Sequence, residues 1–282
     1  MKMIIESKDN KHFKEFKKLT AVDGVRKYGR VIVSGKKLIK EITRSHASLS
    51  RSILIYERYT DEDREMQTIV QSFADADSLY TLKKHLYNEL DTFKTNSPLL
   101  VMQTPEITEW DCRLADGCNL LIPFQDPVNV GAVIRSAAGF GVKKIIILKE
   151  AAHPFHPRCI RASSGAVFKY ANIPSPGGRE LKGGGTEKMI DAQLFRGPSI
   201  AELIKITTDK ALKIIALDMA GTPIDSFQFP NKFLLLPGLE GQGIPEELKA
   251  TAVSIPISAA IESLNAAIAV SIALFAWVRS QS

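Results

Sequence analysis

The hydrophobic residues of this 282-residue chain occur in two patterns that alternate along the sequence. Short unbroken apolar runs are typical of buried strands, whereas apolar residues three and four apart predict amphipathic helices. Within residues 1–103 the two patterns alternate, which predicts a compact α/β/α domain. The expected strands are residues 31–34, 53–56, 79–82 and 99–102, and the expected helices lie at 10–19, 38–42, 61–73 and 86–90.

The first of these helices has the clearest pattern. Asn10 is a natural N-cap, because its side-chain oxygen can accept a hydrogen bond from an N–H group of the first turn. Phe13, Phe16 and Leu19 then recur at helical spacing as the expected buried stripe, and lysines occupy the other face. Residues 104–112 contain Pro105 and a change in polarity, so we expect a linker there.

A second domain, residues 113–282, is organised around residues 119–148. Residues 119–124 form an apolar run, residues 125–127 have turn chemistry, and residues 145–148 form a second apolar run. Between the runs, apolar residues recur at helical spacing up to Gly139. This is the pattern of a βαβ unit, and it predicts a parallel sheet with helices on its faces.

Polar residues gather where the first strand of this unit should end. Asp126 and Asn129 follow that strand, with Asn129 as the expected N-cap, and Arg135 lies off the apolar stripe of the helix. Ligands bind at the carboxyl ends of parallel strands in α/β proteins. The residues alone leave two interpretations open, namely a capped crossover helix with a solvated arginine, or the polar groups of a ligand site.

The remainder of the chain continues the α/β pattern. We expect a helix at 200–207 and strands at 213–218, 233–236 and 253–257. Pro245 suits the first position of a short helix, and Ser263 suits the N-cap of the last helix, 264–278. That last helix is apolar on nearly all sides, so we expect it to be buried against the interior or against a second subunit.

The glycine-rich residues 174–198 contain no GK[ST] after their glycines, which argues against a phosphate-binding P-loop, and we expect a mobile surface loop. Gly139 and Gly141 end a helix instead of opening one, so the fingerprint of a dinucleotide-binding oxidoreductase is missing. His153, His156 and Cys159 are interrupted by prolines and lack a fourth ligand at zinc spacing. We therefore expect no metal site.

Composition adds a charge asymmetry to this picture. The chain has 24% charged residues and a net charge of +6. Residues 1–58 carry 15 Lys and Arg against 6 Asp and Glu, whereas residues 59–110 carry 4 against 10. A basic first segment suits a polyanion such as RNA, although a generic solvated surface has the same composition. Three cysteines without paired spacing, no apolar leader and no span of about 20 apolar residues favour a cytoplasmic protein.

Three sequence motifs carry a resemblance to a known family. They read DPVNVGAVIRSA at 126–137, GLEGQG at 238–243, and IPI at 255–257 followed by ESLN at 262–265. In this order they resemble the three motifs of the SpoU/TrmH branch of the SPOUT RNA methyltransferases, with Leu239 where Ser or Asn is commoner. The first domain resembles the family's N-terminal domain, which is similar to ribosomal-protein folds, although Ser34 stands where a Glu is usual before Gly35.

The resemblance implies a C-terminal domain with a deep trefoil knot that holds S-adenosylmethionine, and methyl transfer to a ribose 2′-OH of rRNA or tRNA. It also implies a homodimer. The implied catalytic residues are Arg135, Asn129, Glu240, Ser263 and Asn265. The implied cofactor-binding residues are Leu236, Gly238, Gly241, Ile255 and Leu264. The residues expected to contact RNA are Lys11, Lys14, Lys18 and Arg161, of which Arg161 lies in a segment resembling the family's R-A-S-x-G-A.

Within this interpretation, Arg135 is expected to stabilise the developing alkoxide or to hold the adjacent phosphate, because a guanidinium is effectively never deprotonated and so cannot serve as a base. The alternative is a non-catalytic RNA-binding protein that keeps the methyltransferase fold. Binding of S-adenosylmethionine separates the two, since a pure RNA binder should ignore the cofactor.

Overall fold

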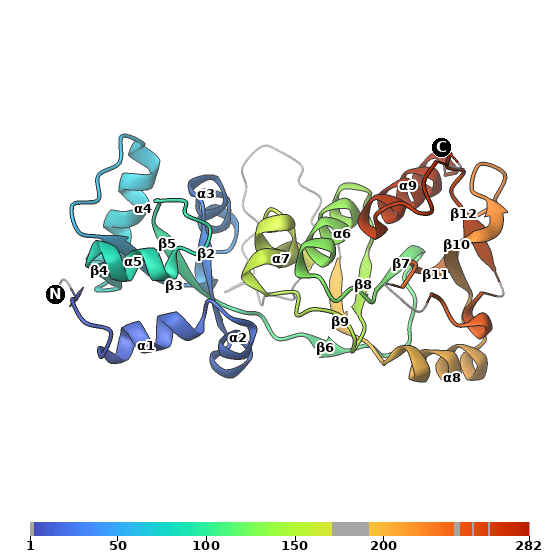
Figure 1. The fold of residues 1–282 in the computed structure, drawn as a ribbon, viewed down its shortest axis with the longest axis horizontal. Helices are drawn as coiled ribbons and strands as arrows, with labels where there is room; N and C mark the ends of the chain where they lie inside the picture. The colour runs from blue at the N-terminus through green and yellow to red at the C-terminus, as the bar shows by residue number, and fades with distance from the viewer. Residues whose placement is uncertain (1–2, 171–191, 240–242, 250, 259, 282) are drawn as a thin grey trace. The chain divides into compact units, whose positions relative to one another are not determined.

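The computed structural model describes residues 3–170, 192–239, 243–249, 251–258 and 260–281. The chain divides into two compact units (Figure 1). The first runs to Pro105 and also includes Phe155–Gly165, and the second comprises Glu106–Pro154 and the chain from Ala166 onwards. The division at Pro105 falls beside the predicted linker. Phe155–Gly165, predicted within the second domain, instead groups with the first unit, because its helix Pro157–Ala162 packs on the strand Arg30–Ser34 and Gly165 lies close to Leu38 and Ile42.

The first unit is built on a five-stranded sheet in the order β1-β4-β3-β5-β2. Strands β1, β4 and β3 are mutually parallel, and β5 runs antiparallel to both β3 and β2. The strands are β1 (Met3–Ile5), β2 (Arg30–Ser34), β3 (Ser50–Tyr56), β4 (Leu79–Leu82) and β5 (Leu99–Gln103). The helices are α1 (Lys11–Lys18), α2 (Val22–Tyr28), α3 (Lys36–Ser45), α4 (Arg64–Asp75), α5 (Lys84–Leu90) and α7 (Pro157–Ala162), with a 3₁₀ turn η1 (Ala47–Leu49).

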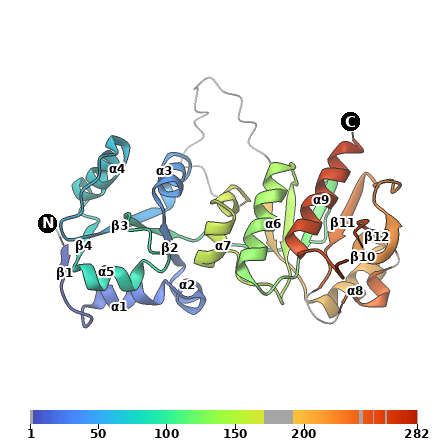
Figure 2. The same ribbon diagram turned by 45° about the horizontal axis from the view of Figure 1, so that its top comes forward.

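Helices cover both faces of this sheet, as the alternation predicts. In Figures 1 and 2, α1 and α5 lie on one face and α3 and α4 on the other. Phe13, Phe16 and Leu19 are all nearly fully buried, packed with alternate strand residues such as Leu54 and Leu82. Asn10 caps α1 by accepting a hydrogen bond from the His12 N–H. The four strands and four helices predicted for this part of the chain are therefore confirmed.

Sequence patterns missed β1 and α2, for physical reasons that differ. Strand β1 has three residues, too few to show a period. Helix α2 contains Gly24, which lowers helix propensity, yet a Cβ there would lie 1.9 Å from the Lys18 carbonyl oxygen. Close packing of the chain against the end of α1, which a local pattern does not reveal, requires that glycine.

The second unit contains a seven-stranded sheet in the order β12-β10-β11-β7-β8-β9-β6, and each neighbouring pair is parallel. The predicted parallel sheet is confirmed. The strands are β6 (Thr108–Glu109), β7 (Gly117–Ile122), β8 (Lys144–Ile147), β9 (Gln193–Arg196), β10 (Ile214–Pro223), β11 (Lys232–Leu236) and β12 (Ala252–Ser254). The helices are α6 (Pro127–Gly139), α8 (Ile200–Lys210) and α9 (Ala266–Arg279), with 3₁₀ turns η2 (Ala166–Tyr170) and η3 (Glu246–Leu248).

Helices α6 and α9 lie on one face of this sheet, and α8 lies on the other (Figures 1 and 2). Leu203 of α8 packs with Leu121 and Leu234, which point to the same face of adjacent strands. Two short strands were not predicted. β6 lies inside the expected linker. β9 lies within the segment 174–198 expected to be a loop, of which residues 174–191 are outside the described part of the chain.

Three predicted helix starts are wrong by a few residues. Asp126, not Asn129, caps α6, because Asp126 accepts the Val128 N–H and Pro127 then fills the first helical position. Asn265, not Ser263, caps α9 by accepting the N–H groups of Ala267 and Ile268. Pro245 is the N-cap of η3 and not its first residue. In each case another residue nearby in the sequence can also serve as the N-cap, so the local pattern does not decide where the helix begins.

Candidate functional site

The three motif segments leave the sheet at one edge. Strand β7 pairs with β11, and β10 lies between β11 and β12. All these pairs are parallel, so the carboxyl ends of β7, β11 and β12 lie on the same side of the sheet. Helix α6 begins a few residues beyond β7, Gly238 follows β11, and Ile255 follows β12. The parallel topology thus brings together segments that are more than a hundred residues apart in the sequence.

A direct hydrogen bond connects the first motif to the third. The Asn265 Nδ2 donates to Asn129 Oδ1 at 3.2 Å. The Oδ1 of Asn265 is already engaged, since it accepts from the Ala267 N–H at 2.9 Å and from the Ile268 N–H. The oxygen of the Asn265 amide therefore caps α9, while its nitrogen binds Asn129 at the start of α6.

Helices α6 and α9 pack along their length below this contact. Ser136 Oγ lies 2.7 Å from Ser271 Oγ, and the rings of Phe140 and Phe275 are 6.5 Å apart. The two helices consequently form a firm support for the polar residues at their N-terminal ends.

Arg135 projects from α6 away from the buried face of that helix. Val130, Val133, Ile134 and Ala137 are all fully buried, whereas Arg135 is exposed. Its guanidinium is therefore accessible to a ligand, and its replacement would not disturb the core.

The predicted cofactor-binding residues are only partly described by the structure. Leu236 is fully buried at the end of β11, and Ile255 and Leu264 are half-buried. A Cβ on Gly238 would meet the Leu217 carbonyl oxygen at 3.6 Å, an ordinary contact distance. Ser263 is exposed, while Glu240 and Gly241 lie outside the described residues.

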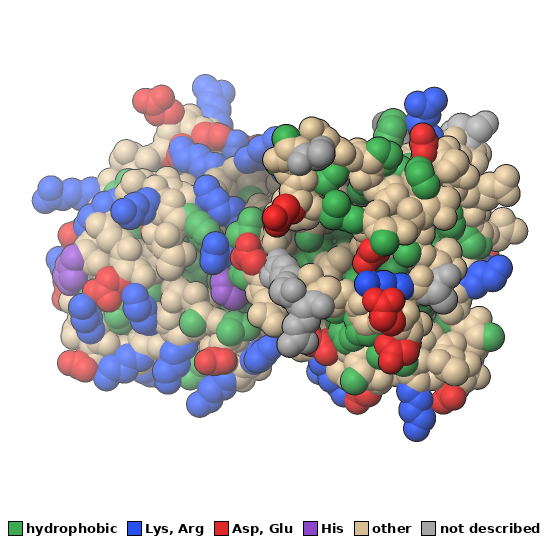
Figure 3. Space-filling model, turned by 45° about the vertical axis from the view of Figure 1, so that its right-hand side comes forward, with side chains coloured by type: hydrophobic (Ala, Val, Ile, Leu, Met, Phe, Trp, Pro, Cys, Tyr) green, Lys and Arg blue, Asp and Glu red, His purple; other side chains and the backbone are tan. Residues whose placement is uncertain are grey.

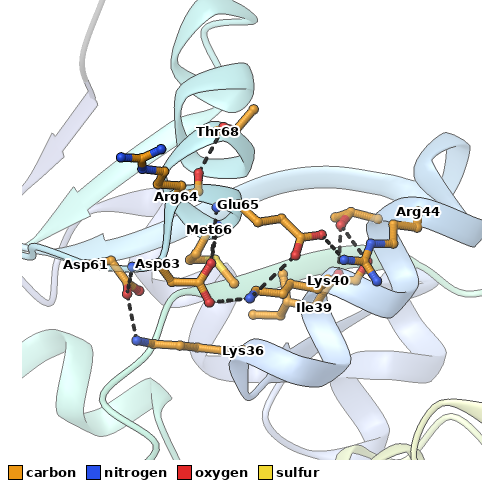
Figure 4. Close-up of polar contacts among 11 residues, drawn as sticks. Lys36, Ile39, Lys40, Arg44, Asp61, Asp63, Arg64, Glu65, Met66 and Thr68 are labelled. Atoms are coloured by element: carbon orange, nitrogen blue, oxygen red, sulfur yellow. Dashed lines mark hydrogen bonds and ion pairs between the residues drawn. The ribbon is translucent and has the colours of Figure 1, made fainter.

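The charge asymmetry of the first unit is largely neutralised within that unit (Figure 4). Lys36 of α3 binds Asp61 at 2.8 Å. Lys40 pairs with Asp63 and lies 3.5 Å from Glu65, which also pairs with Arg44. The basic side of α3 therefore meets the acidic start of α4, and it is not a free surface for a polyanion.

Asp61 is the most sheltered carboxylate of this network, with its side chain 3% exposed. Burial by itself would raise its pKa, but hydrogen bonds from Lys36, Tyr59 and the Asp63 N–H outweigh burial and lower the pKa to about 2. The pKa of Asp63 is also lowered, mainly by its hydrogen bond with Lys40. Both carboxylates are ionised at neutral pH.

The basic face that remains lies along α1. Lys11 is exposed, Lys14 has an exposed ion pair with Asp9 at 3.0 Å, and the Lys18 Nζ lies 6.0 Å from the Tyr28 ring centre. Figure 3 shows many Lys and Arg side chains, in blue, on the first unit at the left of the view. Arg161 is also exposed, and its guanidinium stacks 4.7 Å above the ring of Phe93 within the same unit.

The histidines and cysteine that suggest a metal have other roles where their contacts are known. His156 caps α7 by accepting the Arg158 N–H at 3.1 Å, and Cys159 is buried, which raises the pKa of its thiol. Within the described part of the chain, no three His, Cys, Asp or Glu residues are grouped to hold a metal ion. Over the same residues, no helix has the length and apolar character that a membrane crossing requires.

A comparison with protein families identifies the second unit. The model of the SpoU rRNA methylase family matches residues 120–175 and 181–275, which together make up more than half of the chain. The chain belongs to this family. All the predicted catalytic and cofactor-binding residues lie inside the match, while Lys11, Lys14 and Lys18 lie outside it.

Individual relatives extend the family likeness over nearly the whole chain. A protein of Syntrophobacter fumaroxidans named ribosomal RNA small subunit methyltransferase G 2 is 38% identical over 99% of this chain, which corresponds to 49% of that relative. The chain spans about half the length of the curated relatives it matches.

Solved structures share the fold over their full length. A crystal structure of an RNA 2′-O ribose methyltransferase has a TM-score of 0.74 and 19% identity, with 99% of each chain covered. An rRNA methyltransferase from Sinorhizobium meliloti, solved with bound AdoMet, has a TM-score of 0.71 and 20% identity, with 98% of each chain covered. At these identities the similarity is one of fold, and it extends over both units of the chain.

Proposed function

We propose that this protein transfers a methyl group from S-adenosylmethionine to a ribose 2′-oxygen of rRNA or tRNA. The observation that carries the proposal is the hydrogen bond between Asn129 and Asn265, which joins the first motif, to which the exposed Arg135 also belongs, to the third. Membership of the SpoU family, and the AdoMet bound in a structure of the same fold, support the cofactor.

The chemistry requires help for a poor nucleophile. Methyl transfer would form a bond between the ribose 2′-oxygen and the methyl carbon, break the carbon–sulfur bond of the cofactor to leave S-adenosylhomocysteine, and release the hydroxyl proton to water. A fixed positive group near the 2′-oxygen would stabilise the negative charge that this oxygen gains as it loses its proton. Arg135 supplies such a charge and remains protonated throughout. The hydrogen bond between Asn129 and Asn265 ties the first turn of α6, the helix that carries Arg135, to the start of α9. Glu240 and Ser263 are proposed to orient the ribose.

The cofactor would bind at the carboxyl ends of β11 and β12, against Leu236, Gly238, Gly241, Ile255 and Leu264. This site lies at the sheet edge where α/β proteins bind their ligands. We further propose that this part of the chain forms the deep trefoil knot of SPOUT proteins, with the cofactor bent between its crossing segments. No metal ion is needed for this reaction.

A second copy of the chain completes the proposed assembly. Ile268 and Phe275 of α9 lie about two turns apart on the same side of the helix. They are 53% and 52% exposed, which is unusual for large apolar residues. We propose that α9 pairs with its counterpart in a homodimer and that the first unit, similar to ribosomal-protein folds, presents RNA through α1. The protein would act in the cytoplasm, where its substrate RNA resides.

The decisive experiment identifies the methylated atom. The protein is incubated with radiolabelled S-adenosylmethionine and unmodified rRNA or tRNA, and the RNA is then hydrolysed with alkali. A 2′-O-methyl group blocks cleavage at its nucleotide, so the label should appear in alkali-stable dinucleotides. Label released in mononucleotides would place the methyl group on a base and overturn the proposal. A protein that binds RNA but not the cofactor would support the non-catalytic alternative.

A further inference from the structure

Two basic residues of the first unit lie on aromatic rings instead of beside carboxylates. The Cζ atom of Arg161 is 4.7 Å from the centre of the Phe93 ring. Lys84 Nζ is 3.4 Å from the centre of the Tyr56 ring. Within the part of the chain that the structure describes, neither residue has an ion pair with a carboxylate, unlike the basic residues of α3. An aromatic ring attracts a cation without cancelling its charge, so both residues keep a net positive charge.

The segment 91–97, which carries Phe93, has a defined conformation. Asn96 has a φ of 49°, in the left-handed region that residues other than glycine rarely adopt. Asp91, only 4% exposed, stabilises this turn, because its carboxylate accepts the Asn96 N–H at 2.7 Å. The side-chain oxygen of Asn96 also accepts a hydrogen bond from Lys84 Nζ at 2.8 Å. The segment therefore links the two cations and supports the ring of Phe93.

Arg161 belongs to a helix that is itself well anchored. Helix α7 packs on β2, and its residues Cys159 and Ile160 are buried. Ser163 Oγ fixes the end of the helix by donating to the Ile160 carbonyl oxygen at 3.0 Å. Arg161 is exposed, and among the described residues its guanidinium contacts the Phe93 ring but makes no hydrogen bond. A planar cation is thus held in one place with its hydrogen-bond donors left for a ligand.

We propose that Arg161, supported by Phe93, is a platform on which an unpaired base of the substrate RNA stacks. This inference rests on the proposed function and concerns RNA binding, not the methyl-transfer step. Bases of single-stranded RNA stack on aromatic rings and on guanidinium planes, and the guanidinium charge also attracts the neighbouring phosphates. Phe93 acts through Arg161 as a positioning residue, because its ring holds the guanidinium that meets the base.

The test measures how strongly the whole chain prefers RNA that carries bases. Fluorescence anisotropy gives the Kd for a labelled single-stranded RNA of mixed sequence and for an abasic chain of the same length, which has the same phosphates. The ratio of the two Kd values reports base stacking separately from charge. Arg161→Lys keeps the charge but loses the plane, so it should lower this ratio about tenfold, the effect of losing one stacked base. Phe93→Leu keeps an apolar side chain without a ring and should also lower the ratio.

Two matched controls lie elsewhere in the first unit. Arg51→Lys changes an exposed arginine at the amino end of β3, whose guanidinium donates to the Ser48 carbonyl oxygen at 2.8 Å. Phe73→Leu changes a half-buried phenylalanine of α4. Both controls should leave the ratio of Kd values unchanged.

An unchanged ratio in Arg161→Lys would overturn the inference. An unchanged ratio in Phe93→Leu, with folding confirmed by circular dichroism, would remove Phe93 from the platform, and Arg161→Lys decides the result if Phe93→Leu does not fold. Absence of methyl transfer to any RNA by the unmodified protein would instead count against the proposed function, whichever ratio is measured.

Discussion

At the scale of single residues, Arg135 provides the sharpest test of the chemistry. It is exposed on α6 and lies off the buried face, so Arg135→Ala should fold normally. If its charge stabilises the transition state, the single-turnover rate should fall by about 10²–10³-fold, the range for losing one such donor. The Kd for S-adenosylmethionine, measured by calorimetry, should stay the same. Loss of cofactor binding together with the rate would remove Arg135 from the catalytic role.

Asn265 allows its two hydrogen-bonding tasks to be separated. Asn265→Asp retains an acceptor for the first turn of α9, and its charge suits the helix N-terminus, but it cannot donate to Asn129. We expect normal stability and a slower methyl transfer, by about tenfold, the effect of losing a contact worth about 1.4 kcal/mol. Asn265→Ala should in addition lower the free energy of unfolding by about 1 kcal/mol. If Asn265→Asp is fully active, the contact with Asn129 has no part in catalysis.

At the scale of elements, the acidic start of α4 should make the first unit sensitive to acid. The pKa of Asp61 is lowered from 3.8 to about 2, so the native state holds its charge where the unfolded chain is protonated. The stabilisation is complete above about pH 4 and is lost as the pH falls towards 2. Asp61→Asn should therefore lower the free energy of unfolding by about 2 kcal/mol at pH 7, and the difference should vanish near pH 2.

Urea unfolding at several pH values measures this effect. Asp75→Asn is the control, since Asp75 has an exposed hydrogen bond with Gln71 and should change stability by less than about 0.5 kcal/mol. If both substitutions changed the free energy of unfolding equally at every pH, the charge of Asp61 would make no contribution to stability through Lys36 and its neighbours.

At the scale of the whole molecule, the exposed face of α9 predicts a dimer. Phe275→Glu would place a charge in the proposed interface and should give a monomer at micromolar concentration by light scattering. Met219→Glu is the control, because Met219 is also strongly exposed, at 63%, but lies on β10. A monomeric unmodified protein would refute the dimer.

We also expect RNA binding to depend on the first unit as a whole. Replacing Lys11, Lys14 and Lys18 by Glu should weaken RNA binding across sequences, and the slope of log K against log salt should fall by about 1 for each lost phosphate contact. Lys40→Gln should have little effect, because Asp63 and Glu65 already neutralise that amine. Filter binding at several salt concentrations checks both. Equal losses from the two changes would point to α3 as the RNA surface.

The local sequence determined the class of the fold and most of its elements. Periodicity and capping residues act within a few positions, so the strands of the parallel sheet and helices such as α1 follow from their own segments. The motifs that contain Arg135 and Asn265 can also be found from the sequence alone, and both lie within the residues that the SpoU family model matches. Short elements such as β1 and β6 have too few residues to show a pattern, and they form only because a neighbouring strand offers its backbone.

The tertiary structure decided which residues meet. Asn129 and Asn265 are 136 positions apart, and only the shared edge of parallel strands brings them within hydrogen-bonding distance. The surplus of basic residues near the start of the chain suggests a polyanion partner. The structure shows that part of this charge, on α3, is paired with acidic residues at the start of α4. Hydrogen bonds and ion pairs depend on the distance between atoms in space. The sequence pattern predicts that distance only for residues within one helix or strand.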